Sequence, residues 1–539
     1  MNRIDYQRRA TVEVSVGNTA IGGANPVRLQ SMTNTPTLDT EASVRQCVRL
    51  AEAGAEIVRL TAQGVAHARN LANIRRELRA AGVDTPLVAD IHFNPAAAFA
   101  AAEEVEKVRI NPGNFIDPGR VFKHLEYTDE EYAAELQRLR DKLVPLLDLC
   151  RERHTALRIG VNHGSLSDRI MSRYGDTPAG MVESAMEFLR VCRDEEFNNV
   201  VISIKASNVL VMTETVRRLV AAMDAEDMHY PLHLGVTEAG NELEGRIKSA
   251  VGIGSLLADG IGDTIRVSLS EDPVAEIPVA EMIRGYIGRI AQAAPTGATL
   301  APGYDPFAPA RRISRAAGCV GALQQPVAVG VDFASVAELP QGVKVVEASE
   351  DAVNPIADIR AQMHAMMAAG DDTPVVIRRS YPADMAADRV IVEAAIELGT
   401  LLLDGFADGI AIDAPQLSAD ALSELSLGIL QATRLRFSRT EYIACPGCGR
   451  TLFDLQGTLA RIKEATSHLK GLKIGVMGCI VNGPGEMADA DYGYVGAGFG
   501  RVSLYKGKQL MVKNIPTSEA LPALIELLKA NGDWSDPAE

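Results

Sequence analysis

The stretch LRIGVNHGS, residues 157–165, is a short apolar run that contains one arginine and then ends in small, polar residues. KVRINPGN, residues 107–114, has the same form. From residue 27 to about residue 290, β-branched runs of this kind alternate with longer amphipathic stretches, which is typical of parallel βα units. The predicted strands span residues 27–32, 57–61, 87–91, 107–110, 157–161, 200–205, 232–236 and 264–269. Eight units within about 265 residues predict an N-terminal (β/α)8 TIM barrel, and an open doubly wound sheet is the alternative.

The rest of the chain predicts two further domains. The regular alternation stops after Gly285, and residues 298–312 are rich in Pro, Gly and Ala, as domain boundaries are. Strand patterns at residues 375–379 and 408–414 flank a helical pattern and predict an inserted α/β domain with a structural role. This segment, at about 135 residues, is too short for a second complete barrel. Aromatic and β-branched residues alternate with glycines in residues 492–516, which predicts a C-terminal α+β domain. The expected domains are residues 1–292, 293–435 and 436–539.

The composition excludes several classes of protein. The 539 residues carry a formal net charge of -16, which argues against a general affinity for nucleic acid or anionic membranes. The first residues lack the apolar core of a secretory signal, and we find no uninterrupted apolar run of membrane-spanning length. We therefore expect a soluble, cytoplasmic protein with neither a nucleic-acid nor a membrane partner.

Five of the predicted strands contain a cation within otherwise apolar sequence. These cations are Arg59, Arg109, Arg158, Lys205 and Arg266. Barrel strands are buried on both faces, so a charge inside one needs a reason. Small or polar loop residues, among them Asn111, Asn162 and Ser268, follow the strands and would line the C-terminal mouth of the barrel. Because guanidinium groups bind phosphate oxygens in a bidentate manner, the pattern indicates a site for a diphosphate. The alternative is that these cations form structural ion pairs low in the barrel.

Two acidic residues are expected at the same mouth. Asp90 lies near the end of the third predicted strand, and Glu238 follows the seventh. A carboxyl group at the position of Glu238 can act as a general acid, although a core or capping role is the alternative for both residues. We interpret His92 and His233 as structural histidines with satisfied hydrogen bonds.

The seven cysteines fall into two groups. Single cysteines at positions 47, 150, 192 and 319 are interpreted as free thiols, most of which are buried in proteins. Cys445 and Cys448 form the tight turn CPGCG, and Cys479 follows about thirty residues later, so that the three can converge. The spacing fits either zinc or an iron-sulfur cluster. A zinc site normally has four ligands, and the nearby nitrogen ligand would be His468.

A cubane cluster bound by three cysteines leaves one iron free for another ligand. Glu486 follows Cys479 across a Gly-Pro-Gly turn and is the candidate oxygen ligand. An exposed turn carboxylate is the alternative role for this residue.

Ten motifs, in order along the chain, closely resemble the 4-hydroxy-3-methylbut-2-enyl diphosphate synthase family. They are QSMTNT, VRLTAQG, ADIHFNP, KVRINPGN, RIGVNHGSL, SIKAS, GVTEAG, RVSL, CPGCGRTLFDL and GCIVNGPGE. The resemblance covers the predicted barrel and the C-terminal domain almost throughout. The segment between them resembles the long form of the family, which contains an inserted domain.

The resemblance implies a cofactor, a reaction and roles for individual residues. The cofactor is a [4Fe-4S] cluster held by Cys445, Cys448, Cys479 and Glu486. The reaction is the reductive ring opening of 2-C-methyl-D-erythritol 2,4-cyclodiphosphate, with loss of water, to 4-hydroxy-3-methylbut-2-enyl diphosphate in the MEP pathway of isoprenoid biosynthesis. Glu238 is then the acid that faces the reacting carbons, and Glu486 takes part in catalysis. The implied substrate-binding residues are Arg59, Asp90, Arg109, Asn111, Arg158, Asn162, Lys205, Arg266 and Ser268.

Partners and rival functions complete the expectations. A ferredoxin or a flavodoxin would supply the electrons, and a homodimer is one expected assembly. In short forms of the family, the cluster domain is thought to close over the barrel of a partner subunit. The main rival function is a barrel aldolase, with Lys205 as amine nucleophile, or a pterin-diphosphate synthase, each with a structural zinc site. A non-catalytic electron-transfer protein is the third class.

Overall fold

The computed structural model of the protein describes residues 3–116, 126–240, 242–480, 485, 487 and 489–537. Glu486 lies outside the described residues. Within them, no helix is both long and apolar enough to cross a membrane.

Eight parallel strands form the N-terminal barrel, in the order β8-β7-β6-β5-β4-β3-β10-β9. Their bounds are β3 (Arg28–Met32), β4 (Ile57–Thr61), β5 (Leu87–Asp90), β6 (Lys107–Ile110), β7 (Ala156–Asn162), β8 (Val200–Lys205), β9 (His233–Leu234) and β10 (Thr264–Ile265). A parallel bridge between Ile202 and Leu232 joins β8 to β9 and nearly closes the ring. The barrel prediction is therefore confirmed, and the open doubly wound sheet is wrong.

The last two barrel strands are shorter than predicted. Beyond Leu234 and Ile265, the backbone makes single hydrogen bonds, such as that from Arg266 N–H to the Leu234 carbonyl at 2.9 Å, rather than a continuous ladder. The chain after β9 turns toward the C-terminal domain, where Ala239 pairs with Ala444. These two strands thus end early because their continuations form the barrel mouth.

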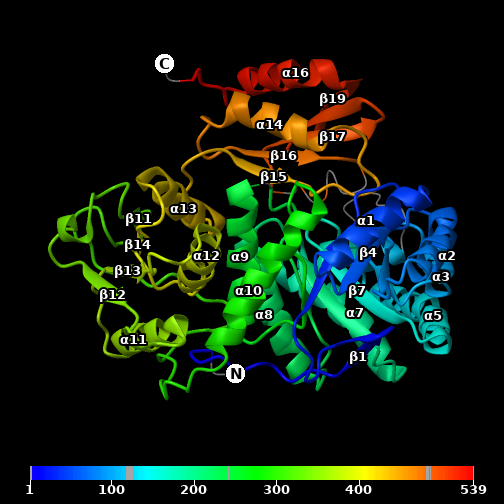
Figure 1. Ribbon diagram of the computed structural model, residues 1–539, viewed down its shortest axis with the longest axis horizontal. Helices are drawn as coiled ribbons and strands as arrows, with labels where there is room; N and C mark the ends of the chain where they lie inside the picture. The colour runs from blue at the N-terminus through cyan, green and yellow to red at the C-terminus, as the bar shows by residue number, and fades with distance from the viewer. Residues whose placement is uncertain are drawn as a thin grey trace.

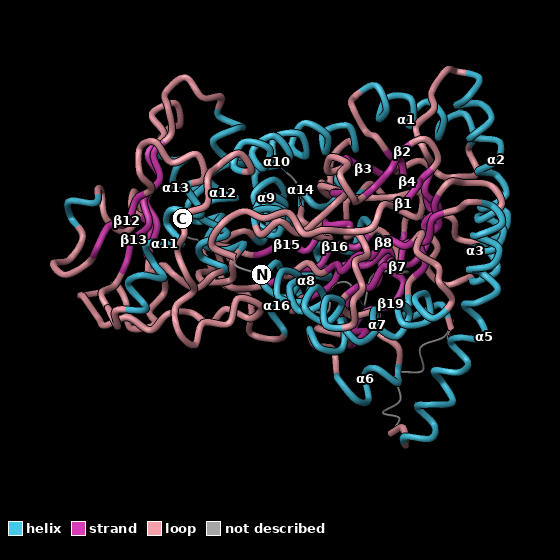
Figure 2. The backbone as a smooth tube through the Cα atoms, turned by 90° about the horizontal axis from the view of Figure 1, so that it is seen from below, coloured by secondary structure: helices cyan, strands magenta, loops and turns pink. Residues whose placement is uncertain are grey.

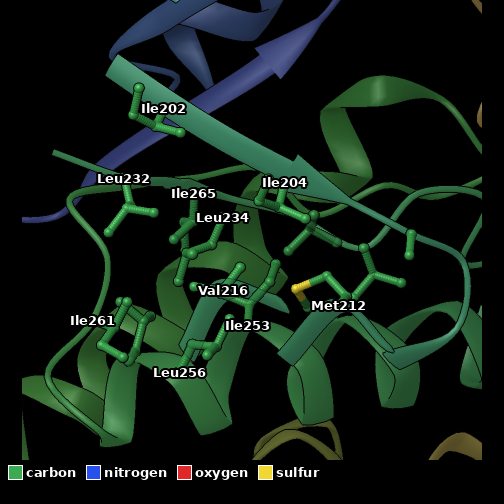
Figure 3. Packing of buried hydrophobic residues seen from close by; sticks show 14 of the residues in the cluster. Ile202, Ile204, Met212, Val216, Leu232, Leu234, Ile253, Leu256, Ile261 and Ile265 are labelled. Atoms are coloured by element: carbon green, nitrogen blue, oxygen red, sulfur yellow. The ribbon is translucent and has the colours of Figure 1, made fainter. Parts of the chain in front are cut away.

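Helices cover the outside of the barrel (Figure 1). They are α1 (Thr40–Glu52), α2 (Val65–Ala80), α3 (Pro95–Ala102), α4 (Pro112–Phe115), α5 (Asp129–Arg153), α6 (Asp168–Tyr174), α7 (Pro178–Asp194), α8 (Val209–Ala225), α9 (Glu242–Ala258), the short 3-10 helix η1 (Pro273–Ala275) and α10 (Glu276–Ile290). Local capping explains their starts: Thr128 and Glu131 form a reciprocal capping box at α5. Figure 3 shows the apolar layer between strands and helices, in which Ile202 and Leu234 pack with Val216 and Ile253.

A short hairpin seals the end of the barrel opposite its mouth. It consists of β1 (Val14–Val16) and β2 (Thr19–Ile21), which pair antiparallel. Val14, Val16 and Ile21 pack against inward-facing residues of the barrel, including Val88 and Val201. This apolar layer was not predicted from the sequence. It leaves the C-terminal mouth as the polar end of the barrel.

The inserted segment forms a four-stranded parallel sheet in the order β11-β14-β13-β12. Its elements are β11 (Val327–Ala328), η2 (Val336–Glu338), β12 (Lys344–Glu347), α11 (Pro355–Ala368), β13 (Val375–Ser380), α12 (Ala387–Leu403), β14 (Gly409–Asp413) and α13 (Ala419–Ala432). The predicted α/β fold is confirmed, including the strands near residues 375 and 409. Figure 2 shows α9 and α10 between this sheet and the barrel strands. Small residues allow the close approach of α9 and α12: a Cβ at Gly254 would lie 2.5 Å from Ile396.

The C-terminal segment forms a mixed sheet in the order β15-β16-β17-β18-β19, with helices packed on it. The elements are β15 (Glu441–Ala444), α14 (Leu455–Thr466), β16 (Lys473–Met477), β17 (Tyr492–Gly498), β18 (Arg501–Lys506), β19 (Gln509–Pro516) and α16 (Thr517–Ala530). β15, β16 and β17 are parallel, whereas β18 and β19 continue antiparallel. The α+β prediction is confirmed. In Figure 1, this domain lies over the barrel at the end opposite β1.

Candidate active site

The barrel mouth and the underside of the C-terminal domain together line one cavity. The five cations predicted from the strands all line it: Arg59, Arg109, Arg158, Lys205 and Arg266. So do Asp90, Asn162, Glu238, Ser268 and the three cysteines Cys445, Cys448 and Cys479. Residues predicted separately from strand patterns and from cysteine spacing therefore meet in one space.

Arg109 is held rigidly at the side of the cavity. Its Nη1 lies 3.1 Å from Asp90 Oδ1, and its Nη2 donates to Asn162 Oδ1 and to the Gly160 carbonyl, each at 2.8 Å. A Cβ at Gly160 would lie 2.5 Å from Arg109 Nε, so a glycine is needed there to leave room for the guanidinium. The orientation of this cation is thus set before any ligand binds.

The other cations differ in how completely they are paired. Arg266 forms a bidentate pair with Glu276 at 2.8 and 3.2 Å, and the Arg59 guanidinium donates to Met32 Sδ. Arg158 is 1% exposed, and its Nε and Nη1 have no hydrogen-bond partner in the described part of the chain. The structural ion pairs considered as an alternative therefore account for Arg109 and Arg266 but not for Arg158.

The pKa values report an excess of positive charge in the cavity. Burial, together with the repulsion of Arg266, lowers the pKa of Arg59 to about 10, although Asp90 opposes the shift. Burial and the neighbouring arginines lower the pKa of Lys205 well below its ordinary value. Burial raises the pKa of Asp90, but Arg59 and Arg109 outweigh this effect and hold it well below its usual range. An anion bound among these groups would relieve the repulsion.

Glu238 occupies the loop between β9 and α9 with an unusual backbone. Its φ is 48°, in the left-handed region that residues other than glycine seldom adopt, and its side chain is buried at the cavity. The neighbouring residue Ala239 pairs with Ala444, next to Cys445. The strained position therefore brings the carboxyl group to the boundary between the barrel and the cysteines.

Asn111, His92 and His233 lie in three different surroundings. Asn111 is not part of the cavity lining; it caps α4, and its Oδ1 accepts from Gly113 N–H at 3.1 Å. His92 lines the cavity, 2.6 Å from Arg109 Nη1, and burial and Arg109 lower its pKa to about 4. The prediction that His233 is satisfied is wrong: it is fully buried, and neither ring nitrogen has a hydrogen-bond partner among the described residues. It lies on the inner face of the barrel near Arg158, where apolar and cationic neighbours offer no acceptor.

The cysteines converge because the strands that precede them are parallel neighbours. Ala444 in β15 pairs with Val476 in β16, so the loops after both strands leave the same edge of the sheet. Gly478 N–H donates to Cys445 Sγ at 3.2 Å, as is favourable for a thiolate. Burial raises the pKa of the uncoordinated Cys445 thiol. A thiolate there needs a positive neighbour such as a metal centre.

Cys445, Cys448 and Cys479 line the cavity together, and cysteine thiolates are the usual ligands of an iron-sulfur cluster. Across the described ranges, no group of three or more His, Cys, Asp or Glu could hold one metal ion. His468, the possible zinc ligand, instead contacts the Ser535 carbonyl at 2.7 Å and packs against Trp534. Cys47, Cys150 and Cys192 are buried free thiols, and Cys319 is exposed.

The sequence reasoning missed Arg450, which also lines the cavity. This residue belongs to the C-terminal domain and reaches Asp90 of the barrel at 3.4 Å. The sequence did contain a signal for this residue: Arg450 follows Cys448 by only two positions, so its cation had to lie close to the predicted thiol cluster. Met32, Ser203 and Thr237 complete the lining without a polar pattern that could have predicted them.

The C-terminal domain closes over the barrel of its own chain. Ser270 Oγ donates to the Cys445 carbonyl at 2.9 Å, and Lys248 of the barrel pairs with Glu441 at 2.9 Å. A Cβ at Gly164 would lie 1.9 Å from the Gly485 carbonyl, so the two backbones touch. Within a single chain, the barrel and the thiol loops thus complete one cavity.

Comparison with known proteins agrees with this architecture. Residues 11–281 match the GcpE TIM-barrel domain, and residues 441–530 match the GcpE protein C-terminal domain. The 4-hydroxy-3-methylbut-2-en-1-yl diphosphate synthase (flavodoxin) of Parabacteroides distasonis is 52% identical to this chain over 610 residues, covering 99% of this chain and 100% of the relative. Proteins of the same name from Bacteroides fragilis and Akkermansia muciniphila are 51% and 46% identical, each covering 99% of this chain and 98% of the relative.

The first of these alignments spans 610 positions, more than the 539 residues of this chain, so that relative contains segments that this chain lacks. The matches nevertheless extend across the barrel, the insert and the cysteine domain. The chain belongs to the GcpE family of 4-hydroxy-3-methylbut-2-en-1-yl diphosphate synthases.

Proposed function

We propose that the protein reduces 2-C-methyl-D-erythritol 2,4-cyclodiphosphate to 4-hydroxy-3-methylbut-2-enyl diphosphate, with ring opening and loss of water. One observation carries the proposal: five barrel cations, which outnumber the carboxylates beside them, and three cysteines of the C-terminal domain line the same cavity. The cations suit a diphosphate, and the cysteines suit a redox centre beside it.

The redox centre in this proposal is a [4Fe-4S] cluster, bound by Cys445, Cys448 and Cys479, with Glu486 as the fourth ligand. The cluster supplies single electrons, which the substrate needs in order to lose a hydroxyl group. A flavodoxin is the proposed electron donor, because the names of the relatives include it. Glu486 would give one iron an oxygen ligand, which is more labile than a thiolate.

The barrel residues bind and orient the substrate. The fixed guanidinium of Arg109 and the unpaired edge of Arg158 donate to diphosphate oxygens, and Lys205 adds a third donor. Arg59, Arg266, Asn162 and Ser268 line the same space and complete the anion site. Asp90 positions Arg109 rather than facing an anion directly, since it pairs with that cation at 3.1 Å.

Glu238 is the proposed general acid. The hydroxyl group that leaves the substrate needs a proton to depart as water, and a carboxyl group at the boundary of barrel and cysteines can donate it. Its burial and its strained backbone hold it at that boundary.

The insert has a structural role in this proposal. It occupies residues 293–435 between the barrel domain (1–292) and the cluster domain (436–539), and its helix α12 packs on α9 of the barrel. No cavity residue comes from the insert among those that the structure describes. By packing on α9, which follows the Glu238 loop, the insert supports this side of the barrel.

The test is anaerobic purification with iron and sulfide reconstitution, followed by an assay with reduced flavodoxin and the cyclic diphosphate. We expect a brown protein with about four irons per chain, as three cysteines and a fourth ligand require. The reaction product should be the open-chain diphosphate. Colourless protein after careful reconstitution, or bound zinc in place of iron, would contradict the proposal.

A further inference from the structure

Arg450 is a buried cation that crosses from the C-terminal domain into the barrel. It follows the CPGCG turn, is 7% exposed and lines the cavity. Its Nη2 lies 3.4 Å from Asp90 Oδ2, at the end of strand β5. The two residues are far apart in the sequence and meet only because the C-terminal domain covers the barrel mouth.

Asp90 divides its two oxygens between the two domains. Oδ1 accepts from Arg109 of the barrel at 3.1 Å, and Oδ2 faces Arg450 at 3.4 Å. His92 Nε2 lies 3.5 Å from the same Oδ2. One carboxylate therefore joins a barrel cation to a cation of the thiol loop. Removing one partner from such a buried group is costly, because the remaining charge is left without compensation.

Arg450 also lies among the thiols. It lines the cavity together with Cys448 and Cys479, and its Nη2 faces Asp90 of the barrel. Cysteines of one domain and a carboxylate of the other thus share one space with this cation. Its charge persists under all conditions in which the protein folds.

The backbone that carries Arg450 is pressed against the barrel. A Cβ at Gly449 would lie 2.5 Å from the Thr35 carbonyl and 2.9 Å from Thr61 Oγ1. Both threonines belong to the mouth of the barrel, after β3 and at the end of β4. A glycine at position 449 permits this approach and brings the next residue within reach of Asp90.

We propose that Arg450 is a positioning residue that fastens the thiol loop to the barrel through Asp90 and offsets the negative charge of the thiolate ligands. The first role rests on the contacts within this chain. The second role rests on the proposed function, because it requires the cysteines to bind an iron-sulfur cluster. Arg450 thereby fixes the distance between the diphosphate site and the redox centre.

The first test measures how firmly the thiol loop is held. Arg450→Met removes the charge and keeps most of the side-chain length. Hydrogen exchange at the backbone amides of residues 446–454 should become about tenfold faster or more, as expected when a charged hydrogen bond is lost. Lys463→Met is the matched control, because Lys463 also pairs across the domain boundary, with Glu244 at 3.3 Å, but lies outside the cavity. Unchanged exchange in Arg450→Met, or an equal increase in Lys463→Met, would overturn the role of Arg450.

The second test measures the charge effect in the reconstituted enzyme. We expect Arg450→Met to retain its iron and to shift the reduction potential of the cluster to a more negative value, while Arg450→Lys keeps most of the potential. Substrate affinity should fall more in Arg450→Met than in Arg450→Lys. An unchanged potential in Arg450→Met would refute the charge role. If the wild-type protein takes up no cluster, the proposed function fails, whereas the exchange measurement on the same protein still decides whether Arg450 fastens the loop.

Discussion

Two clusters of buried charge in this protein are built in opposite ways. The first lies at the joint between the barrel and the insert, and the second lies in the cavity below the cysteines. At the joint, Arg217 and Arg360 alternate with Asp259 and Asp404, and each of the four carboxylate oxygens lies 2.8 to 3.1 Å from an arginine nitrogen. In the cavity, cations outnumber carboxylates, and Arg158 has two nitrogens with no hydrogen-bond partner in the described residues.

The difference shows which buried charged groups find their partners within the chain and which do not. At the joint, every carboxylate oxygen has an arginine partner within the chain, so these charges hold α8 and the end of α9 to α11 and the end of α12. Arg3 adds a third cation, 3.5 Å from Asp259. The cavity stays positively charged until an external anion enters. Burial of unpaired cations is unfavourable for stability, and a protein retains it where a ligand supplies the missing charge.

The largest effect is expected at the joint between the barrel and the insert. Arg360→Met leaves Asp259 and Asp404 short of a partner inside the protein. We expect the free energy of unfolding to fall by about 3 to 5 kcal/mol, as when one partner of a buried ion pair is removed. Turnover per folded molecule should be unchanged, because the joint does not line the cavity. Urea unfolding followed by circular dichroism measures the loss.

The control for this variant is Arg378→Met in the same insert. Arg378 pairs with Glu347 at 3.0 Å, but both side chains are substantially exposed. Its removal should change stability by less than about 1 kcal/mol. Equal losses in the two variants would mean that the joint is no more important than a surface ion pair.

The second prediction concerns chemistry in the cavity. Glu238→Gln keeps the shape of the side chain and removes its acidic proton. We expect turnover to fall by roughly a hundredfold or more while substrate affinity changes little, since general acid catalysis acts in the transition state. Steady-state kinetics combined with calorimetric substrate binding separates the two quantities. Weakened binding with unchanged turnover would assign Glu238 to the anion site instead.

The third prediction sharpens the contrast between paired and unpaired cations. Arg158→Met should raise the Michaelis constant by about one to two orders of magnitude, because a charged hydrogen bond to the diphosphate contributes roughly 1.5 to 3 kcal/mol. The same variant should unfold at an equal or higher temperature in the absence of substrate, since it removes an unpaired buried charge. A loss of stability like that of Arg360→Met would show that Arg158 is a structural residue.

The smallest expected effect is a pH dependence at the joint. Burial raises the pKa of Asp259, but Arg217, Arg360 and Arg3 lower it more, from 3.8 to about 2. Because its folded-state pKa is depressed, Asp259 stabilises the protein fully above its unfolded-state pKa, and this contribution is lost as the pH falls from about 4 to 2. It amounts to about 2 kcal/mol. Unfolding free energies of wild type and Asp259→Asn over this range should differ in slope; parallel curves would contradict the shift.

How much of the site could be predicted depends on how far apart in the sequence the contacting residues lie. The strands of the barrel and the cations within them could be predicted because short apolar, β-branched runs and single charges are local features. The convergence of Cys445 and Cys479 was also readable, since both follow strands that pair in parallel. The role predicted for Asn111 in binding substrate is untested, but its side chain caps α4 outside the cavity lining. Its position at a strand end could not reveal which way the side chain points.

Local sequence thus determined the barrel, the α/β character of the insert, the cation-bearing strands and the paired cysteine turn. Only the tertiary structure decided that the C-terminal domain closes on its own barrel, that Arg450 meets Asp90 and that His233 is buried without partners. The physical reason is that backbone propensities and side-chain periodicity act over a few residues. Contacts such as Arg450 to Asp90, 360 positions apart, depend on how whole domains pack, and no local pattern specifies that packing.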